Sequence, residues 1–316
     1  MNASLAVTTP VDAMTLIEMA EERLFASATA LREAAFGHRI ALCAIINARS
    51  GNCTMDCHFC SQSRHNHTPI DVFPLLPEEQ LRQRILELAE LPVARIGVVT
   101  SGPALGGEEL ERLCGVIASL PDGVRGRVCG SLGRLPGKSL NRLKTVGLTR
   151  LHHNLETSQS WYPHICTSQT WDQRRQTVLT AVQAGLTPCC GGLFGLGESW
   201  KDRVDLAFSL KAMGVRHVPM NFLHPHPKTP LALRRPLEAD EALRIIAVFR
   251  HILPDATLRV CGGRPVTLGD RQHKMFAAGA NALMTGDYLT TPGLGVARDL
   301  DMIAAEGLEV NCDTEC

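Results

Sequence analysis

The stretch Cys53-Thr54-Met55-Asp56-Cys57-His58-Phe59-Cys60 carries three cysteines, separated by three residues and then by two. Three thiolates on so short a loop can hold three irons of a cubane iron–sulfur cluster and leave the fourth iron open for chemistry. A structural zinc site is the alternative interpretation, but it needs four ligands, and no Cys-x2-His partner follows at the usual distance. The ligand count therefore favours an iron–sulfur cluster over zinc.

Around this stretch, short runs of branched apolar residues alternate with longer segments of helical periodicity. The runs expected to form strands are residues 40–47, 95–101, 126–132, 150–156, 187–194, 217–223, 257–263 and 281–286. The helices expected between them are residues 77–91, 108–120, 138–146, 170–184, 199–213, 239–252 and 271–278. Repeated strand–helix alternation predicts parallel strands joined by right-handed crossovers, and the simplest closed form is an α/β fold of the (β/α)8 TIM-barrel type.

The position of the cysteine loop supports a barrel. An open, doubly wound sheet is the alternative α/β fold. Residues 53–60 follow the first predicted strand, and barrel enzymes carry active-site loops at that end of their strands. Helical periodicity over residues 9–36 predicts a helix packed on the outside or bottom of the barrel. We therefore expect an N-terminal helical extension at 1–37, a barrel at 38–292 and a C-terminal tail at 293–316.

Composition narrows the classes of partner and compartment. The 316 residues are 45% hydrophobic, enough to bury the core of one barrel. The 32 basic and 32 acidic residues balance, so charge gives no reason to expect binding to nucleic acid or to a membrane. The N-terminus lacks the residue order of a signal peptide, so we expect a cytoplasmic protein. In such a chain, 12 cysteines indicate metal or redox use and not a disulfide framework.

Several cysteines fall in the predicted strands themselves. Cys43 lies in the first strand, Cys129 in the third, Cys189 and Cys190 in the fifth, and Cys261 in the seventh. Each layer inside a barrel is filled from alternate strands, so one thiol from each of these strands can form a ring. Unrelated core cysteines are the alternative, but the layer pattern favours a second metal cluster. Neighbouring strand residues face opposite ways, which leaves open whether Cys189 or Cys190 points inward.

Polar residues follow the strands at the expected mouth of the barrel. Asn154 and Glu156 share a face at the end of the fourth strand, and Asn221 ends the sixth. Glu156 can accept hydrogen bonds from ribose hydroxyls, and each asparagine offers both a donor and an acceptor. Arg174 or Arg175, one helix later, is a candidate partner for a carboxylate. An ordinary solvated arginine is the alternative interpretation.

Two other features near the mouth are candidate binding elements. Residues 191–198 contain four glycines, and the missing side chains of Gly191 and Gly192 allow a flat or charged ligand to approach the backbone. The glycine spacing does not fit a dinucleotide-binding fingerprint. Arg264 follows the seventh strand. It either lies on the surface or offsets the negative charge of an internal cluster with its guanidinium.

These stretches resemble the biotin synthase family of radical S-adenosylmethionine (SAM) enzymes. The three-cysteine spacing is that of the radical SAM superfamily, and its continuation Cys60-Ser61-Gln62-Ser63 is similar to the Cys-Pro-Gln-Ser of the family. The similarity extends over about residues 37–290. Its matching runs are residues 50–63, 129–133, 153–158, 189–198, 218–221, 263–264, 278–281 and 289–292.

The resemblance implies a reaction that uses two clusters. In that family a 4Fe–4S cluster and SAM yield a 5′-deoxyadenosyl radical, which removes hydrogen from dethiobiotin. An auxiliary iron–sulfur cluster gives up the sulfide that closes the thiophane ring. The implied SAM-cluster ligands are Cys53, Cys57 and Cys60. The other implied contacts are Phe59, Glu156, Arg174 and Gly191-Gly192 with SAM, Asn154 and Asn221 with dethiobiotin, and Cys129, Cys189 and Arg264 with the auxiliary cluster.

The sequence departs from the family pattern at the auxiliary cluster. The family's usual site takes another cysteine from the second strand, but no cysteine lies between positions 60 and 114 here. Cys43 and Cys261 instead stand where the common form has serines, and His152 replaces an asparagine. We therefore expect a variant auxiliary cluster, of the 2Fe–2S or of a four-iron type. The expected ligand set is Cys43, Cys129 and Cys189, completed by Cys261 or Arg264.

The partners expected besides dethiobiotin are a reductant protein, such as flavodoxin or ferredoxin, and a second copy of the chain in a homodimer. A related radical SAM enzyme that needs no sulfide donor, such as a hydrogenase-cofactor maturase or a carbon-skeleton mutase, is the first alternative. A non-catalytic metal-binding barrel is the second. Asn154, Asn221 and the strand cysteines favour sulfur insertion. Cys312 and Cys316 match nothing in the family, and we expect them in a mobile tail, with a ligand or resolving-thiol role as the alternative.

Overall fold

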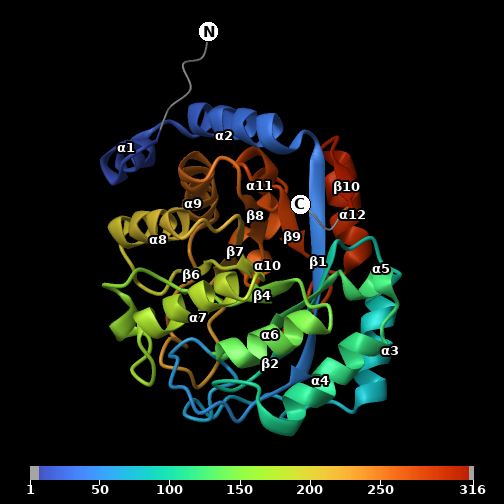
Figure 1. Ribbon diagram of the computed structural model, residues 1–316. Helices are drawn as coiled ribbons and strands as arrows, with labels where there is room; N and C mark the ends of the chain where they lie inside the picture. Colours follow the sequence, from blue (N-terminus) through green and yellow to red (C-terminus); the bar gives the residue numbers. More distant parts are fainter. Residues whose placement is uncertain (1–6, 313–316) are drawn as a thin grey trace.

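A closed barrel of parallel strands forms the centre of the computed structural model, which describes residues 7–312 (Figure 1). The order around the barrel is β1-β2-β3-β4-β5-β7-β8-β9, and β9 pairs with β1 to close it. The strands are β1 (Arg39–Arg49), β2 (Arg95–Thr100), β3 (Val128–Ser131), β4 (Arg150–His152), β5 (Thr187–Cys189), β6 (Gly192–Phe194), β7 (His217–Phe222), β8 (Thr257–Val260) and β9 (Ala282–Met284). The predicted (β/α)8 TIM-type barrel is confirmed.

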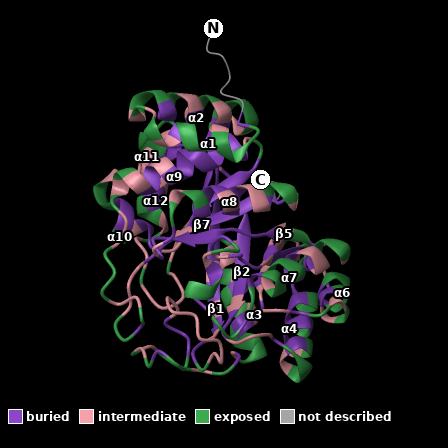
Figure 2. Ribbon diagram, turned by 90° about the vertical axis from the view of Figure 1, so that its left-hand side faces the viewer, coloured by how far each residue is buried: buried purple, intermediate pink, exposed green. Residues whose placement is uncertain are grey.

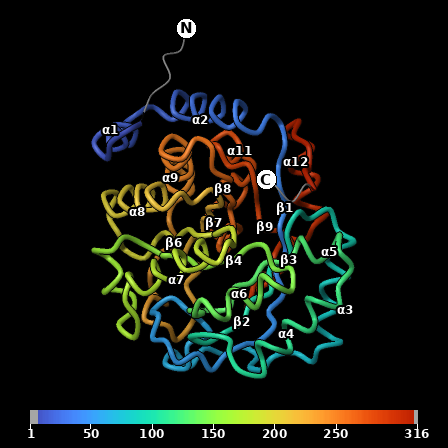
Figure 3. Tube along the Cα trace, in the orientation of Figure 1, coloured from blue at the N-terminus to red at the C-terminus, as the bar shows by residue number. Residues whose placement is uncertain are grey.

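Helices cover the outside of the barrel, and the chain passes from strand to helix around it in sequence order (Figure 3). The helices are α3 (Glu78–Ala89), α4 (Gly107–Ser119), α5 (Asp122–Arg125), α6 (Gly137–Thr145), α7 (Trp171–Gln183), α8 (Trp200–Ala212), α9 (Ala239–Ile252), α10 (Arg264–Leu268) and α11 (Lys274–Ala277), with 3-10 turns η2 (Tyr162–His164) and η3 (Gly269–Arg271). Capping boxes at Thr170 and Ser199 start α7 and α8. None of the helices in residues 7–312 is long and apolar enough to span a membrane.

The predicted fifth strand, residues 187–194, is divided into β5 and β6. The division has a local cause in the segment that follows β4. The amide of Leu155 donates to the carbonyl of Gly191, and Glu156 forms an isolated bridge with Gly192. These bonds occupy backbone groups of residues 191–192, so the hydrogen-bond ladder between neighbouring strands is interrupted there. β4 accordingly ends at His152, and Asn154 and Glu156 lie in the loop beyond it.

The N-terminal extension is broken where a single helix was expected. α1 (Pro10–Thr15) starts with a capping box formed by Thr9 and Asp12, and η1 (Leu16–Glu18) ends at Met19, whose backbone is extended. α2 (Glu21–Phe36) then packs on α9. The hydroxyl of Ser27 lies 2.9 Å from Nε2 of His251. α2 therefore covers the end of the barrel opposite the loop that follows β1, as Figures 1 and 2 show.

The C-terminal residues are more structured than the expected tail. α12 (Val296–Ala305) is followed by β10 (Glu309–Asn311), which pairs in parallel with the start of β1. This short strand extends the sheet at the α2 end of the barrel. Cys312 is exposed, and Cys316 lies outside the described residues. The ordered chain thus reaches at least to Asn311, and its last strand belongs to the barrel sheet.

Arg250 is one of the largest polar residues in the core, and its side chain is fully buried. It comes from α9, and its guanidinium donates to the carbonyls of Pro254, Ala256 and Gly279 at 2.8–2.9 Å and to the side-chain oxygen of Asn281 at 2.8 Å. A guanidinium has five N–H donors in a fixed fork, so one side chain can satisfy several loop carbonyls together. Arg250 therefore ties α9 to the segments that lead into β8 and β9.

We predict that Arg250→Ala lowers the free energy of unfolding by about 3 kcal/mol or more, because several buried carbonyls lose their donor and a cavity remains. Urea unfolding followed by circular dichroism measures the loss. Arg235→Ala, at an exposed position, is the control and should change stability by no more than about 0.5 kcal/mol. Equal effects of the two substitutions would contradict the role assigned to Arg250.

Candidate active site

The three cysteines of the opening stretch lie on the loop after β1 and line a cavity of about 190 Å³, called here the loop cavity. Hydrogen bonds within the loop fix its conformation. The amide of Cys53 donates to the carbonyl of Gln62 at 3.0 Å. The side-chain amide of Asn66 donates to the carbonyls of Cys57 and Cys60 at 3.1 and 2.8 Å. These bonds direct all three thiols toward the same space.

Asp56 anchors the same loop from outside. Its carboxylate accepts hydrogen bonds from the amides of Thr167 and Ser168, both at 3.0 Å, and from the Ser168 hydroxyl at 2.6 Å. Burial raises the pKa of Asp56, but the hydrogen bonds from Ser168 and Thr167 lower it more, and the pKa lies well below its usual range. The loop is therefore fixed to the segment that precedes α7.

A second cavity, of about 380 Å³, lies inside the barrel and is called here the barrel cavity. Four strand-borne thiols line it: Cys43 on β1, Cys129 on β3, Cys189 on β5 and Cys261 directly after β8. Cys190 is fully buried but is not part of this lining. The structure thus answers the question that the sequence left open, because Cys189 is the residue that faces inward.

Buried arginines share the barrel cavity with these thiols. Arg150 on β4 and Arg259 on β8 both line it, and each is only 3% exposed. Nε and Nη1 of Arg150, and Nε and Nη2 of Arg259, have no hydrogen-bond partner among the described residues. A buried guanidinium with unsatisfied donors is costly. The cavity therefore suits an anionic occupant such as a thiolate-bound iron–sulfur cluster.

Arg264 does not reach this cavity, which corrects its predicted role at a cluster. β8 ends at Val260, and the chain turns at Gly263, whose φ is +76°. Arg264 thus begins α10, where its guanidinium donates to Asp299 of α12 at 2.7 Å, and both side chains are buried. On this part of the chain, the arginine that lines the cavity with the thiols is Arg259. The sequence carried a signal for it, because Arg259 and Cys261 are two apart and share one strand face.

The thiols of the barrel cavity differ in how readily they ionise. Burial raises the pKa of Cys129 to about 12. Burial also acts on Cys189, but a hydrogen bond from His152 and the charges of His152, Arg259 and Arg150 outweigh it and lower the pKa of Cys189 to about 7. Iron–sulfur ligation needs thiolates. Of Cys129 and Cys189, Cys189 thus gives up its proton more easily.

The loop cavity and the barrel cavity share a wall. Phe59, Cys60, His152, Asn154 and Glu156 line both of them. Glu156, with a φ of +70°, also carries an ion pair to Arg174 of α7 at 2.9 Å. A ligand that fills the shared region therefore meets Cys60 on one side and the four strand-borne thiols on the other.

Asn154 and Asn221 are held by the backbone around them. The side-chain oxygen of Asn154 accepts from the amide of Gly191 at 3.0 Å, and that of Asn221 accepts from Gly262 at 3.1 Å. The NH₂ group of Asn221 donates to the carbonyl of Gly192 at 3.2 Å. An amide NH₂ has two N–H donors, so each asparagine can offer one to a ligand while its orientation stays fixed.

Gly191 and Gly192 stay predicted backbone contacts of a ligand, and the structure shows a further reason for these two glycines. Neither residue lines either cavity. A Cβ at Gly191 would lie 1.9 Å from the carbonyl oxygen of Pro219, and one at Gly192 would lie 2.6 Å from that of Glu156. The two glycines are therefore needed because strands and loops approach closely behind the wall of the site.

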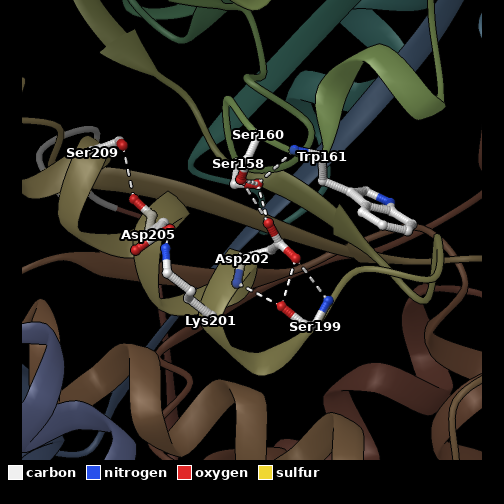
Figure 4. Close-up of polar contacts among 8 residues, drawn as sticks. All are labelled: Ser158, Ser160, Trp161, Ser199, Lys201, Asp202, Asp205 and Ser209. Atoms are coloured by element: carbon white, nitrogen blue, oxygen red, sulfur yellow. Dashed lines mark hydrogen bonds and ion pairs between the residues drawn. The ribbon is translucent and has the colours of Figure 1, made fainter.

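Asp202 holds the segment that follows Glu156 (Figure 4). One carboxylate oxygen accepts from the hydroxyls of Ser158 and Ser160 at 2.6 and 2.9 Å, and the other accepts from the amide and hydroxyl of Ser199 at 2.9 and 2.6 Å. Burial raises the pKa of Asp202, but these hydrogen bonds lower it more, to about 2. The first turn of α8 thus fixes the loop beyond β4.

The thiols that line the two cavities are donors that fit iron–sulfur clusters. No group of three or more His, Cys, Asp or Glu side chains in residues 7–312 is arranged around the position of one metal ion. A cluster contains several irons and takes its thiolates from a wider circle. A closed barrel, a three-cysteine loop after its first strand and thiols inside the barrel together define a radical SAM enzyme.

Comparisons with known proteins agree with this class. The Radical SAM superfamily model matches residues 48–210, and the model of the Biotin and Thiamin Synthesis associated domain matches residues 219–309. The chain is 66% identical to the biotin synthase of Desulfovibrio desulfuricans over 97% of each chain. It is 46% identical to that of Nitratidesulfovibrio vulgaris over 90% of this chain and 81% of that one. The chain belongs to the biotin synthase family.

Solved structures support the fold. Methylornithine synthase superposes with a TM-score of 0.81 at 19% identity, covering 98% of this chain and 95% of that one. The FeFe-hydrogenase maturase from Carboxydothermus hydrogenoformans superposes with a TM-score of 0.79 at 18% identity, covering 98% of this chain and 77% of that one. At such identities the likeness extends to the barrel alone. The maturase and mutase alternatives have no support beyond it.

We predict that Asp202→Asn lowers stability at neutral pH by about 1–3 kcal/mol and raises the KM for SAM, because the loop that carries Glu156 loses a charged acceptor. The folded pKa of about 2 lies below the ordinary value of 3.8. The stabilising effect of Asp202 is therefore complete above about pH 4 and is lost as the pH falls toward 2. Chemical unfolding at neutral pH and at about pH 3 measures this difference.

Asp205→Asn is the matched control for this prediction. Asp205 lies one turn later on the same helix and pairs with Lys201, whose side chain is 77% exposed (Figure 4). Exposed pairs of this kind contribute at most about 0.5 kcal/mol. Equal KM values for SAM in wild type and Asp202→Asn would show that Asp202 does not position the site.

Proposed function

We propose that this chain converts dethiobiotin to biotin by radical SAM chemistry, with two iron–sulfur clusters bound at opposite ends of one continuous site. The observation that carries the proposal is that Cys60 of the loop lines the same cavity of about 380 Å³ as the four strand-borne thiols, and that this cavity adjoins the loop cavity. When bound, the clusters and SAM supply a radical that removes hydrogen and a sulfide that enters the product.

At the loop end, the proposed ligands of the 4Fe–4S cluster are Cys53, Cys57 and Cys60. Burial raises the pKa of Cys60 to about 11, so its proton must leave when iron binds, and iron binding weakens as the pH falls. Phe59 offers an aromatic face next to the thiols. Glu156 and Arg174 offer an acceptor for ribose hydroxyls and a cation for a carboxylate, and their ion pair keeps both side chains in place.

At the barrel end, Cys43, Cys129, Cys189 and Cys261 are the proposed ligands of the auxiliary cluster. Four thiolates are the ligand set of either a 2Fe–2S or a 4Fe–4S cluster, and we propose the four-iron type here. The guanidiniums of Arg150 and Arg259 supply positive charge and unused donors to the sulfur atoms. On β2 a Cβ at Gly97 would lie 3.7 Å from Sγ of Cys129. Gly97 thus occupies the place from which a second-strand cysteine would reach this site.

Between the two ends, Asn154 and Asn221 are the proposed contacts of the substrate. Each holds its side-chain amide in a fixed orientation and can donate one N–H to the ureido carbonyl of dethiobiotin. Leu193, Phe222 and Leu223 line the same cavity and give it an apolar surface. The site can thus exclude water, which protects a reactive radical from unwanted sources of hydrogen.

We further propose a cytoplasmic location, reduction by a flavodoxin or ferredoxin, and a homodimer. All eleven cysteines in residues 7–312 are free thiols, which suits a reducing compartment. The homodimer and the electron donor stay predictions from the family resemblance. The division into an extension at 1–37, a barrel at 38–292 and a tail at 293–316 is likewise a proposal.

We predict that the anaerobically reconstituted chain forms biotin from dethiobiotin, SAM and a reductant, as measured by mass spectrometry. Cys60→Ala should lose both SAM cleavage and biotin formation, because its thiol completes the three-ligand loop. Cleavage of SAM by the wild type without any biotin would reject sulfur insertion and leave another radical SAM reaction. Absence of SAM cleavage would reject the whole proposal.

We predict that Cys43→Ala and Cys261→Ala each lose the auxiliary cluster, so that iron and sulfide fall by about half while SAM cleavage persists. Mössbauer spectra of the reconstituted proteins distinguish the remaining 4Fe–4S cluster from the missing one. Cys114→Ala is the control, since Cys114 is a buried thiol of α4 outside both cavities. Full iron content in both cavity variants would show that neither thiol is a ligand.

A further inference from the structure

Cys166 is a thiol that the three-cysteine motif does not include. Its sulfur lies 3.7 Å from the sulfur of Cys57, although the two residues are 109 positions apart in the sequence. Cys166 follows η2, is 2% exposed and is not part of the lining of either cavity. Cys57 is partly exposed and lines the loop cavity. Cys57 therefore faces the loop cavity, and Cys166 lies behind it.

The backbone around both cysteines holds this pair together. The amide of His58 donates to the carbonyl of Ile165 at 2.9 Å. On the other side, the amide of Asp56 donates to the hydroxyl of Ser168 at 3.0 Å, and the amide of Ser168 donates back to the Asp56 carboxylate at 3.0 Å. The neighbours of Cys57 are thus bonded to the neighbours of Cys166 on both sides. The sulfur contact is a fixed feature of the fold.

We propose that Cys57 and Cys166 are a redox pair that forms a disulfide when the loop has no cluster. The inference rests on the proposed function in one respect, which is that Cys57 is a cluster ligand. In protein that carries the cluster, iron occupies the Cys57 sulfur and prevents the disulfide. A disulfide bond is about 2.05 Å long, so the two sulfurs need to close by less than about 2 Å. Side-chain rotation can supply this movement while the tied backbone stays in place.

The reaction needs an oxidant, which is a small disulfide such as oxidised glutathione. The Cys57 thiolate attacks one sulfur of it, forms a mixed disulfide and releases one glutathione thiolate. The Cys166 thiolate then attacks the Cys57 sulfur, forms the internal disulfide and releases the second glutathione. Two protein thiols are oxidised, one disulfide is reduced, and the two protons end on glutathione. Cys57 is thereby protected from irreversible oxidation.

The test uses the full-length chain, stripped of iron anaerobically with a chelator and then treated with oxidised glutathione. Peptide mapping by mass spectrometry should find residue 57 linked to residue 166, with fragment ions that locate the bond. Dithiothreitol should remove the link and restore iron uptake. In Cys166→Ser, Cys57 should instead keep glutathione as a stable mixed disulfide. Protein that retains its cluster should not form the link.

Cys114→Ser is the matched control and should still form the link, because Cys114 lies in α4 away from the loop. Thermal unfolding checks that each variant is folded. Peptide mapping of the wild type shows whether the disulfide forms, even if a variant does not fold. A bond from Cys57 to Cys53 or Cys60, or equal glutathione adducts in wild type and Cys166→Ser, would overturn the proposal. Biotin formation by the loaded wild type tests the proposed function independently.

Discussion

The charge inside the barrel is the constraint on which the site depends. Arg150 and Arg259 are buried among four thiols, with guanidinium nitrogens that no described residue satisfies. Removing a guanidinium from water without partners for all of its donors costs several kcal/mol. The Cys189 thiol, whose pKa is lowered to about 7, can ionise beside the arginines and offset part of this cost. An anionic cluster bound to the four thiols would supply the missing acceptors. Packing alone does not account for such an interior, whereas a resident anionic group does.

Rigid loops at the carboxyl ends of the strands complement this interior. Two carboxylates hold these loops in place, and both accept hydrogen bonds from serine or threonine residues far away in the sequence. Asp56 ties the cysteine loop to the segment before α7, and Asp202 ties the loop after β4 to the start of α8. A site that must hold cofactors and substrate in register benefits from such supports outside the cavity.

The sequence was sufficient for the barrel, because strand and helix periodicities are local properties. It also located the thiols, since alternate strands fill one layer of a barrel interior. It did not show that Arg264 pairs with Asp299, or that Gly191 and Gly192 pack against neighbouring backbone, for one reason. The direction of a side chain just beyond a strand depends on how the chain turns there, and tertiary contacts fix that turn. Arg259 was overlooked although it shares the strand face of Cys261, because a buried arginine is unusual.

β1 has a consequence for the order in which the molecule is made. It pairs with β2 along the chain, and also with β9 and β10 from the far end of the sequence. The register Arg39 with Glu309 joins residues separated by nearly the full length of the chain. During synthesis β9 and β10 follow β1 by more than 200 residues, so β1 lacks these two neighbours until they have been made. Until β9 and β10 pair with β1, the barrel interior that holds the strand-borne thiols has an open side.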